Sequence, residues 1–419
     1  DYSMAGERVA LITTRSVGEN ERNVFLRESE IRSLISTLGL NVVCHQSFTI
    51  KKENPVTFLG KGQVEEAVEW ARAFDAEEVI LDAFLSPRVE MNLEAAFSLP
   101  VSDREAVIEA IFFQNAHSRE ARLQIEKARA LYEKPRLIFR EANLSQQRGG
   151  VRGAKGEGEK ELELERRTIE ERIKSLDREL ETLKKTRSVQ RQKREKTGIF
   201  TFALTGYTNA GKSTLLNRLT STTVLAEDKL FATLDTTTRS LTLPSGQKVL
   251  VSDTVGFIQN LPHSLIEAFS STLEEALSSD AVIIVADASH PDSVKCYETT
   301  LNTLTELGAK DKVKLVVINK VDSIYDDISY SFLKSQGIPT VETSMKTGEG
   351  IEELLSFMEK TTDEIFETIF LRLPYSSPIL GELSRKEEIV DVKYEDYSIK
   401  VKARVRKTEK NRYIDWIEA

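Results

Sequence analysis

Four short stretches in the second half of the chain carry residues whose types and spacing suit the chemistry of nucleotide phosphates. The first, "GYTNAGKST" (206–214), matches G-x-x-x-x-G-K-[ST] between an apolar run and a helical segment, the context that this motif needs. Backbone N–H groups of such a loop surround a β-phosphate, while Lys212 can neutralise phosphate oxygens and the Ser213 hydroxyl can bind Mg²⁺. The predicted nucleotide-binding residues of this loop are Gly206, Tyr207, Thr208, Asn209, Ala210, Gly211, Lys212, Ser213 and Thr214.

The second stretch, "DTVGFIQNLPH" (253–263), predicts contacts to Mg²⁺ and the γ-phosphate. Asp253 follows an apolar run and can hold Mg²⁺ through a water, and the Gly256 N–H can meet a γ-phosphate. Phe257 stands where such a turn often carries a glutamine that orients the attacking water, and its side chain has no donor or acceptor. Gln259 is a polar candidate, although its simpler interpretation is a solvated loop residue. We therefore expect slow hydrolysis by the isolated protein, with the missing positioning supplied by a partner.

The third and fourth stretches predict guanine recognition. In "NKVD" (319–322), Asp322 can accept from N1–H and the 2-amino group, and Asn319 can contact N7. Adenine lacks that pair of donors, so it would leave the Asp322 carboxylate without hydrogen bonds. A site of this kind therefore binds adenine much more weakly than guanine. "TSMKTGEG" (343–350) supplies backbone N–H groups for the guanine O6. The predicted residues are Asn319, Lys320, Val321, Asp322, Ser344, Met345 and Lys346.

A threonine between the first two stretches should close over Mg²⁺ when a γ-phosphate is present. "LFATLDTTTRS" (230–240) offers Thr233, Thr236, Thr237 and Thr238, and their spacing alone does not choose among them.

The elements that must position these residues form a mostly parallel sheet. Near-continuous apolar runs at 197–206, 248–254, 281–288, 314–320 and 339–344 are typical of buried parallel strands, and most are separated by helical segments. "LPSGQK" (243–248) is a tight turn that makes one edge antiparallel. The sequence thus predicts a P-loop nucleotide-binding domain over 198–362, followed by a small α+β domain over 363–419 with two expected strands.

Two further parts precede this domain, so the fold class is multidomain α/β. Strands at 8–14, 41–48 and 77–83 alternate with helices at 24–38 and 62–74, which predicts a small α/β domain over 5–115. The "FLGKGQ" segment (58–63) is interpreted as a tight strand-to-helix turn.

Residues 116–197 are predicted to form a long antiparallel helical hairpin. Its second helix carries Ile169, Ile173, Leu176, Leu180 and Leu183 at steps of 4, 3, 4 and 3, a heptad seam. The glycine-rich and arginine-rich segment 142–161 would be the loop at the tip.

Charge is segregated along the chain. Residues 143–198 hold 16 Lys and Arg against 11 Asp and Glu, a net charge of +5. Because the whole chain has a net charge of −9, the rest of the chain has a net charge of −14. A run of basic residues is often only a solvated helix face. On an otherwise acidic protein, it could also bind the phosphates of a nucleic acid. The cations at the end of the second helix are Lys184, Lys185, Arg187, Arg191, Lys193, Arg194 and Lys196.

Composition predicts a soluble, cytoplasmic protein. We find no apolar run long enough to span a membrane and no signal peptide. Two cysteines and four scattered histidines give neither a disulfide framework nor a zinc site.

These stretches together resemble the HflX family of translational GTPases, over nearly the whole chain. The resemblance rests on "GYTNAGKSTLLNRLT", "FATLDTTTR", "SDTVGFIQNLPH", "NKVD", "FLGKGQVEE" and "LSQQRGGVRGAKGEGEKELELERR". It implies that Thr233 is the Mg²⁺ threonine and, with Lys212 and Gly256, a catalytic residue. Ser213, Thr233 and Asp253 would then hold Mg²⁺. It also extends the nucleotide-binding set to Phe231, Ala232, Thr233, Leu234, Asp235, Asp253, Thr254, Val255 and Gly256.

This chain departs from the family pattern at three places: Thr236 replaces a proline, "GEGE" (156–159) replaces "GPGE", and Ser344-Met345 replaces Ser-Ala. The resemblance further implies binding to the large (50S) ribosomal subunit, and splitting or rescue of 70S ribosomes. The hairpin would contact ribosomal RNA near the peptidyl-transferase centre, where Arg148, Arg152 and Lys155 on the glycine-rich loop would follow an irregular phosphate path.

Two other hypotheses stay open from the residues alone. The chain could be a metabolic GTPase whose hairpin is an oligomerisation arm, in which case ribosomes would not change its hydrolysis rate. It could also be a general RNA chaperone or helicase, in which case ATP turnover would survive loss of Lys212. We expect a monomer.

Overall fold

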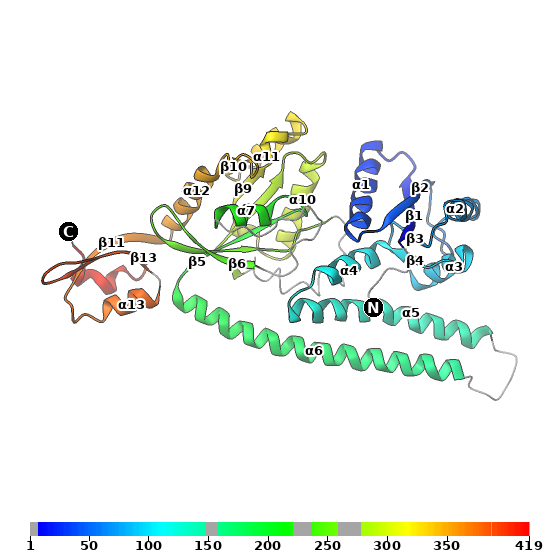
Figure 1. Ribbon diagram of the computed structural model, residues 1–419, viewed down its shortest axis with the longest axis horizontal. Coiled ribbons are helices and arrows are strands. Elements are labelled where there is room, and N and C mark those ends of the chain that lie inside the picture. Colours follow the sequence, from blue (N-terminus) through cyan, green and yellow to red (C-terminus); the bar gives the residue numbers. More distant parts are fainter. Residues whose placement is uncertain (1–6, 148–156, 221–236, 259–277, 387, 419) are drawn as a thin grey trace. The chain divides into compact units, whose positions relative to one another are not determined.

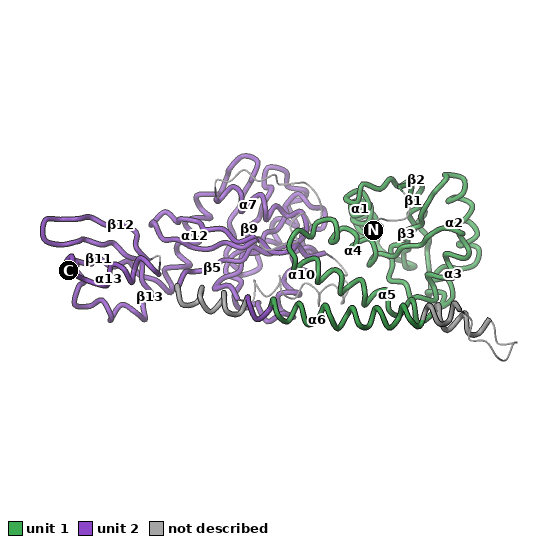
Figure 2. Tube along the Cα trace, turned by 60° about the horizontal axis from the view of Figure 1, so that its bottom comes forward, with its two compact units in different colours: residues 1–183, 229–231, 260–270 green, residues 184–228, 232–259, 271–419 purple. Residues whose placement is uncertain are grey.

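The computed structural model describes residues 7–147, 157–220, 237–258, 278–386 and 388–418 (Figure 1). Within helices, the side chains of 140–147, 157–162 and 187–197 lie outside the description. The chain divides into two compact units, one containing 1–183 and the other most of the remainder from residue 184 (Figure 2).

The first unit contains a four-stranded parallel sheet in the order β2-β1-β3-β4. Its strands are β1 (Arg8–Ser16), β2 (Asn41–Ile50), β3 (Glu78–Leu81) and β4 (Val101–Asp103). The predicted βαβαβ pattern is therefore confirmed. Strand β4 was not predicted, because three residues are too few to show an alternation of apolar and polar side chains.

Helices α1 (Glu21–Thr37), α2 (Lys61–Ala73), α3 (Pro87–Phe97) and α4 (Arg104–Asn115) accompany this sheet. Short polar side chains cap the N-termini of several of them, as in the bonds from Arg22 N–H to Asn20 and from Ala106 N–H to Asp103. The predicted tight turn before α2 is present. Phe58 there has a φ of 60°, and the Gly60 N–H donates to Gln63 Oε1 at 3.0 Å.

The helical hairpin consists of α5 (Arg119–Gln147) and α6 (Glu157–Thr197). Ion pairs join the two helices in antiparallel register, since Arg119 near the start of α5 pairs with Glu179 and Lys134 pairs with Glu170. Leu176 of the heptad seam is fully buried. The other seam residues, Ile169, Ile173, Leu180 and Leu183, are half-buried.

The predicted tip loop over 142–161 was too long. Residues 142–147 continue α5 and residues 157–161 begin α6. The error has a physical reason: the run "LSQQ" contains no glycine, and glutamine and leucine are good helix formers. Arg148, Arg152 and Lys155 lie outside the described residues.

The second unit contains a six-stranded sheet in the order β10-β9-β8-β5-β7-β6. Every pairing is parallel except that of β6 with β7, so the mostly parallel sheet with one antiparallel edge is confirmed. The strands are β5 (Phe200–Gly206), β6 (Thr237–Thr242), β7 (Lys248–Asp253), β8 (Ala281–Asp287), β9 (Val313–Asn319) and β10 (Thr340–Thr343).

Two apolar cores cover the two faces of this sheet. Alternate residues of one strand reach opposite cores, as Val285 and Ile284 of β8 do. The described helical elements around the sheet are α7 (Lys212–Leu219), α10 (Ser293–Glu306), η1 (Lys310–Lys312), η2 (Val321–Ser323), α11 (Asp327–Lys334) and α12 (Ile351–Asp363). None of the helices in the described part of the chain is long and apolar enough to cross a membrane.

The chain ends in a three-stranded antiparallel sheet in the order β11-β13-β12. It comprises β11 (Phe366–Leu373), β12 (Ile389–Tyr394) and β13 (Ile399–Arg406), with α13 (Ile379–Arg385) and η3 (Lys410–Trp416). The two predicted strands are present as β12 and β13. The third, β11, was missed, and it pairs with β13 along its whole length.

Candidate nucleotide-binding site

The predicted nucleotide-binding stretches begin at one edge of the six-stranded sheet, where parallel strands end together. The strand registers connect Leu204 to Asp253, Gly206 to Val285, and Asp287 to Asn319, which in turn lies opposite Thr343. Ligands of open α/β sheets bind outside the carboxyl ends of the strands. The topology therefore brings four stretches that are up to 137 residues apart in sequence, from 206 to 343, to a single edge.

The loop 206–214 has the backbone shape of an anion cradle. Asn209 has a φ of 61° and Gly211 a φ of 95°, and helix α7 begins directly after them. A side chain at Gly211 would collide with the Asn319 amide nitrogen, so glycine is required here both for the backbone angle and for the close approach. The start of α7 directs its N–H groups toward the space in front of the loop, where they can bind an anion.

Lys212 lies beneath this loop rather than in solvent. Its side chain is buried, and Nζ donates to the carbonyl oxygens of Gly206 at 3.2 Å and Tyr207 at 2.9 Å. Burial lowers the pKa of Lys212 to about 8, while the nearby Asp253 carboxylate opposes that shift. A cation with so little solvent around it interacts strongly with any phosphate oxygen that enters the cradle.

Ser213 and Asp253 bring two oxygen donors together. The Ser213 hydroxyl donates to Asp253 Oδ2 at 2.6 Å, and Asp253 is buried at the end of β7. Hydroxyl and carboxylate oxygens are the hard ligands that Mg²⁺ prefers, and P-loop GTPases generally use Mg²⁺ with GTP. The donor set therefore fits this ion. Among the described residues, no group of three or more His, Cys, Asp or Glu side chains forms a separate metal site.

The four candidate threonines for closing over Mg²⁺ divide into two pairs. Thr237 and Thr238 belong to strand β6, where Thr238 Oγ1 lies 2.8 Å from Ser252 Oγ. Thr233 and Thr236 lie outside the described residues.

Gly256 and Phe257 attach the start of the 253–263 stretch to the phosphate loop. A Cβ at Gly256 would lie 2.8 Å from Thr208 Cα and 3.0 Å from Lys212 Nζ, so glycine alone permits this approach. The Phe257 N–H donates to Gly206 O at 3.0 Å, and Phe257 O accepts from Thr208 N–H at 2.8 Å. The Phe257 ring is 3% exposed and packs in the same apolar core as Ala203 and Ile284.

Phe257 therefore has a structural function that the sequence alone does not reveal. Its backbone continues the sheet between the phosphate loop and the second stretch, and its ring anchors that connection in the core. The side chain points into protein and not toward solvent. Gln259, together with the rest of the stretch from 259 to 263, lies outside the described residues.

Asn319 and Lys320 link the guanine-recognition stretch to the phosphate loop. The buried Asn319 donates from Nδ2 to Ala210 O at 3.0 Å and accepts from Thr343 Oγ1 at 3.3 Å. Lys320, with a φ of 62°, donates from Nζ to Asn209 O at 3.1 Å and to Asp287 Oδ2 at 2.8 Å. A base and a phosphate bound at these two stretches would thus be held at a constant separation.

Two partners in this region were not predicted. Asp287, the last residue of β8, holds Lys320 in place; its position at the same sheet edge as Asn319 was the signal that could have revealed it. Ser344 was predicted to act through its backbone, yet its hydroxyl also donates to Asp322 Oδ1 at 2.6 Å. This hydrogen bond holds the pKa of Asp322 below its usual value, so the carboxylate stays charged and able to accept from a base.

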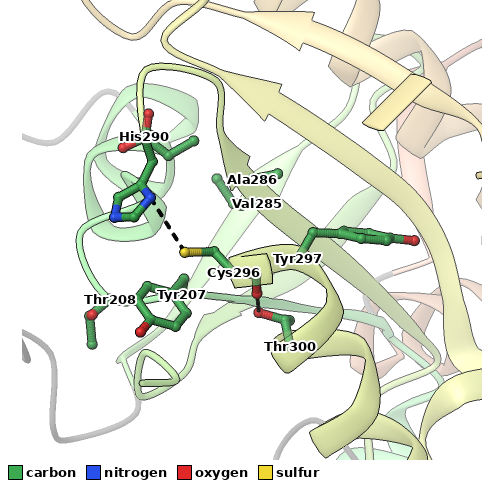
Figure 3. Close-up of a pocket in the computed structure, with 9 residues that line it drawn as sticks. Tyr207, Thr208, Val285, Ala286, His290, Cys296, Tyr297 and Thr300 are labelled. Atoms are coloured by element: carbon green, nitrogen blue, oxygen red, sulfur yellow. Dashed lines mark hydrogen bonds between the residues drawn. The ribbon is translucent and has the colours of Figure 1, made fainter. Parts of the chain in front are cut away.

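The side chain of Tyr207 lines a small pocket between the phosphate loop, β8 and α10 (Figure 3). Its ring lies 6.2 Å from that of His290, whose Nδ1 is 3.6 Å from Cys296 Sγ. Tyr207 is 6% exposed. A contact from Tyr207 to nucleotide would therefore have to come from its backbone.

Comparison with known proteins gives matches over nearly the whole chain. Family models match at residues 27–113, described as GTP-binding GTPase N-terminal, at 115–194, described as GTP-binding GTPase Middle Region, and at 201–320, described as 50S ribosome-binding GTPase. The GTPase HflX of Lacrimispora saccharolytica is 42% identical over 93% of this chain and 91% of its own. That of Treponema denticola is 45% identical over 81% of this chain and 88% of its own.

The chain belongs to the HflX family of GTPases. It is accordingly a GTP-hydrolysing enzyme with guanine nucleotide as its ligand. Among solved structures, a GTP-binding protein from Sulfolobus solfataricus in complex with GDP is 22% identical, with a TM-score of 0.46, over 86% of this chain and 99% of that chain.

The structure thus brings together the predicted residues of three stretches and part of a fourth. Residues 206–214, 253–256, 319–322 and 344–346 lie at one sheet edge. The remaining predicted positions at the nucleotide, namely Phe231, Ala232, Thr233, Leu234 and Asp235, lie outside the described residues. Lys184 and Lys185 on α6 are exposed. Arg187, Arg191, Lys193 and Arg194 belong to the same helix, with side chains outside the description.

Proposed function

We propose that this HflX-family GTPase binds the large ribosomal subunit and uses GTP hydrolysis to split or rescue stalled or idle 70S ribosomes. The match of residues 201–320 to a family described as 50S ribosome-binding GTPase carries the proposal. The basic end of α6 supports it, because a net positive segment on a chain of net charge −9 suits an RNA backbone.

The nucleotide site would work as follows. Lys212 and the N–H groups at the start of α7 bind the β- and γ-phosphates, and Asp322 and Asn319 select guanine. Ser213 and Thr233, together with Asp253 through a water, would hold Mg²⁺, which would neutralise charge on the phosphate oxygens when bound. Water attacks the γ-phosphate in line with the leaving GDP oxygen, and the Gly256 N–H stabilises the γ-phosphate oxygens. The other predicted nucleotide-binding residues of the four stretches shape this site through their backbone.

Hydrolysis in this scheme is slow until a partner acts. Phe257 can offer the attacking water no hydrogen bond, and its ring is anchored in the core. The group that positions the water must therefore come from elsewhere in the complex. We propose that the ribosome supplies it or reorganises the loop after Phe257.

The hairpin would be the arm that reaches ribosomal RNA. Ion pairs of Arg119, Lys127, Lys134 and Arg172 join α5 to α6. A stiff arm can present its tip, with Arg148, Arg152 and Lys155, and its basic end, with Lys184 and Lys185, to phosphates at separate places. The other cations of that end are Arg187, Arg191, Lys193 and Arg194.

Sedimentation and hydrolysis together test the proposal. With a non-hydrolysable GTP analogue, the protein should comigrate with isolated large subunits. Large subunits should also raise the GTPase rate at least about a hundredfold, the lower end of what a positioned catalytic group supplies. Reversing charge at Lys184→Glu with Lys185→Glu should weaken comigration. Lys51→Glu with Lys52→Glu, an equally exposed lysine pair, is the matched control. An unchanged GTPase rate with large subunits would favour the metabolic alternative and end the proposal.

A further inference from the structure

Within the described part of the chain, one face of the C-terminal sheet has no apolar cover, and its residues differ sharply from those of the opposite face. Leu371, Val401 and Ala403 pack with α13 and η3 on the covered face. Because side chains alternate along a strand, the residues between them project from the other face. These are Phe370 and Arg372 of β11, Lys400 and Lys402 of β13, and Asp391 and Lys393 of β12.

Phe370 is the aromatic centre of this uncovered face. Its side chain is 53% exposed, and it lies directly opposite Lys402 in the strand register. The backbone of Phe370 is held on both sides, because Phe370 O accepts from Glu418 N–H at 2.8 Å and Leu371 bridges to Ile417. The ring is therefore presented on a rigid strand rather than on a loop.

The central strand places cations at every second position of the same face. Lys400, Lys402, Arg404 and Arg406 follow one another on β13, with successive members about 7 Å apart. Arg404 is buried against Asp363, and the Arg406 guanidinium lies 5.2 Å from the Phe366 ring centroid. This row of four cations thus begins at the six-stranded sheet and ends in solvent.

Only some of these charges are neutralised by the fold. Glu418 pairs with Arg372 at 2.6 Å, and Glu395 pairs with Lys400 at 2.8 Å. For Lys393 and Lys402, no ion pair with a carboxylate is formed within the parts of the chain that the structure describes. Lys402 therefore lies on the strand next to Phe370, and Lys393 lies one strand further along the same face, with no carboxylate of the described residues paired to either cation.

We propose that this face binds single-stranded RNA, with a base stacked on Phe370 and phosphates against Lys393 and Lys402. Exposed aromatic rings on a rigid sheet, with cations beside them, are a common means of binding single-stranded nucleic acid. A duplex keeps its bases stacked inside and would leave Phe370 unused. The carboxylates of an acidic protein segment could pair with the cations but would not stack on Phe370. The inference goes beyond the proposed function, since it involves neither the hairpin nor the nucleotide site.

Fluorescence anisotropy on the full chain tests this site, with a labelled single-stranded RNA of about 12 nucleotides as probe. Phe370→Ala should weaken binding about tenfold, and Phe370→Trp should retain it, because stacking needs a ring and not phenylalanine itself. Lys393→Glu with Lys402→Glu should weaken binding about tenfold and reduce its dependence on salt. Arg385→Glu, an exposed cation on α13 behind the sheet, is the control and should change little.

Two further measurements separate this site from the hairpin. The sheet variants should still weaken RNA binding when the hairpin already carries Lys184→Glu with Lys185→Glu. RNA containing 4-thiouridine should crosslink to 366–373 or 399–406. If the sheet variants bind RNA within about twofold of the unaltered chain, or if crosslinks fall only on the hairpin, the inference is wrong. It is also wrong if a poly-glutamate peptide, and not RNA, binds this face. Large-subunit stimulation of the GTPase is measured separately, so either proposal can fail alone.

Discussion

At the scale of single residues, the site depends on side chains whose function is to hold other parts of the site. Asn319 and Lys320 bond to the carbonyl oxygens of Ala210 and Asn209, and Ser344 holds the Asp322 carboxylate. Phe257 anchors the second stretch to the phosphate loop. Sequence patterns predicted nucleotide contacts for several of these residues, but not the bonds among them, because the partners lie far apart in the chain.

Replacing Phe257 with glutamine is expected to damage the protein without accelerating hydrolysis. The ring is buried in an apolar core, so Phe257→Gln would bury an amide and lose packing at a cost of about 2–4 kcal/mol in the free energy of unfolding. Urea denaturation and the basal GTPase rate measure the two effects, with Phe257→Leu as the milder control. A faster basal rate in Phe257→Gln would show that the side chain can reach the attacking water.

Glu388 in the C-terminal domain should make stability depend on pH. Burial raises the pKa of its carboxyl to about 7, well above the ordinary value of 4.5. The folded state then keeps a proton that the unfolded state loses, so stability falls as pH rises from about 4.5 to 7 and is level above 7. Over that window the free energy of unfolding falls by about 3 kcal/mol, because a tenfold difference in proton affinity between the two states corresponds to about 1.4 kcal/mol.

Glu388→Gln should remove this dependence. We expect it to raise the melting temperature at pH 8 and to leave it nearly unchanged at pH 4.5, measured by differential scanning calorimetry. Glu364→Gln, an exposed carboxyl at the start of the same domain, is the control and should behave alike at both pH values. Equal effects of Glu388→Gln at the two pH values would contradict a raised pKa.

At the scale of elements, the hairpin and the sheets were predicted to different extents. The heptad spacing correctly indicated α6 and its antiparallel partner, and buried apolar runs correctly indicated the parallel strands. The strands that were missed, β4 and β11, lack those signals. β4 has three residues. β11 carries Thr368 and Arg372 between its apolar residues because they project from the uncovered face.

Leu176 is expected to carry much of the packing between α5 and α6. It is fully buried, whereas Ile169 of the same seam is half-buried. Leu176→Ala should therefore cost about 2–4 kcal/mol locally, and Ile169→Ala distinctly less. Hydrogen exchange of the amides in 163–186 should quicken in the first variant more than in the second. Equal protection in the two variants would mean that the ion pairs, and not the seam, hold the hairpin together.

At the scale of the whole molecule, a junction within the second unit joins the six-stranded sheet to the C-terminal sheet. Arg404 of β13 is 7% exposed and donates to Gln247 Oε1 at 3.0 Å, in the turn between β6 and β7. It also donates to Thr362 Oγ1 at 3.2 Å and pairs with Asp363 at the end of α12. One guanidinium thus connects the C-terminal sheet to the turn that leads into β7, the strand that ends at Asp253.

Removing this guanidinium should loosen the junction. In Arg404→Ala, the buried Gln247 and Thr362 lose a hydrogen-bond donor. A buried polar group without a partner lowers the free energy of unfolding by about 1–3 kcal/mol. Differential scanning calorimetry should show a lower melting temperature, and hydrogen exchange should quicken in 366–373 and 399–406. Lys407→Ala, one residue beyond β13 and exposed, is the control. An unchanged melting temperature in Arg404→Ala would mean that the apolar contacts alone hold the junction.

The sequence by itself determined the chemistry of this protein and most of its parallel strands. The spacing of Lys212, Ser213, Asp253 and Asp322 indicates guanine nucleotide because a phosphate loop, an Mg²⁺ ligand and a base-reading carboxylate each require a particular residue at a particular strand end. Such local requirements are visible along one chain. The tertiary structure alone decided which groups hold these residues, namely Asp287 on Lys320, Ser344 on Asp322 and the core around Phe257. Those contacts join residues from different strands and loops, so they depend on the sheet order, which no short stretch of sequence contains.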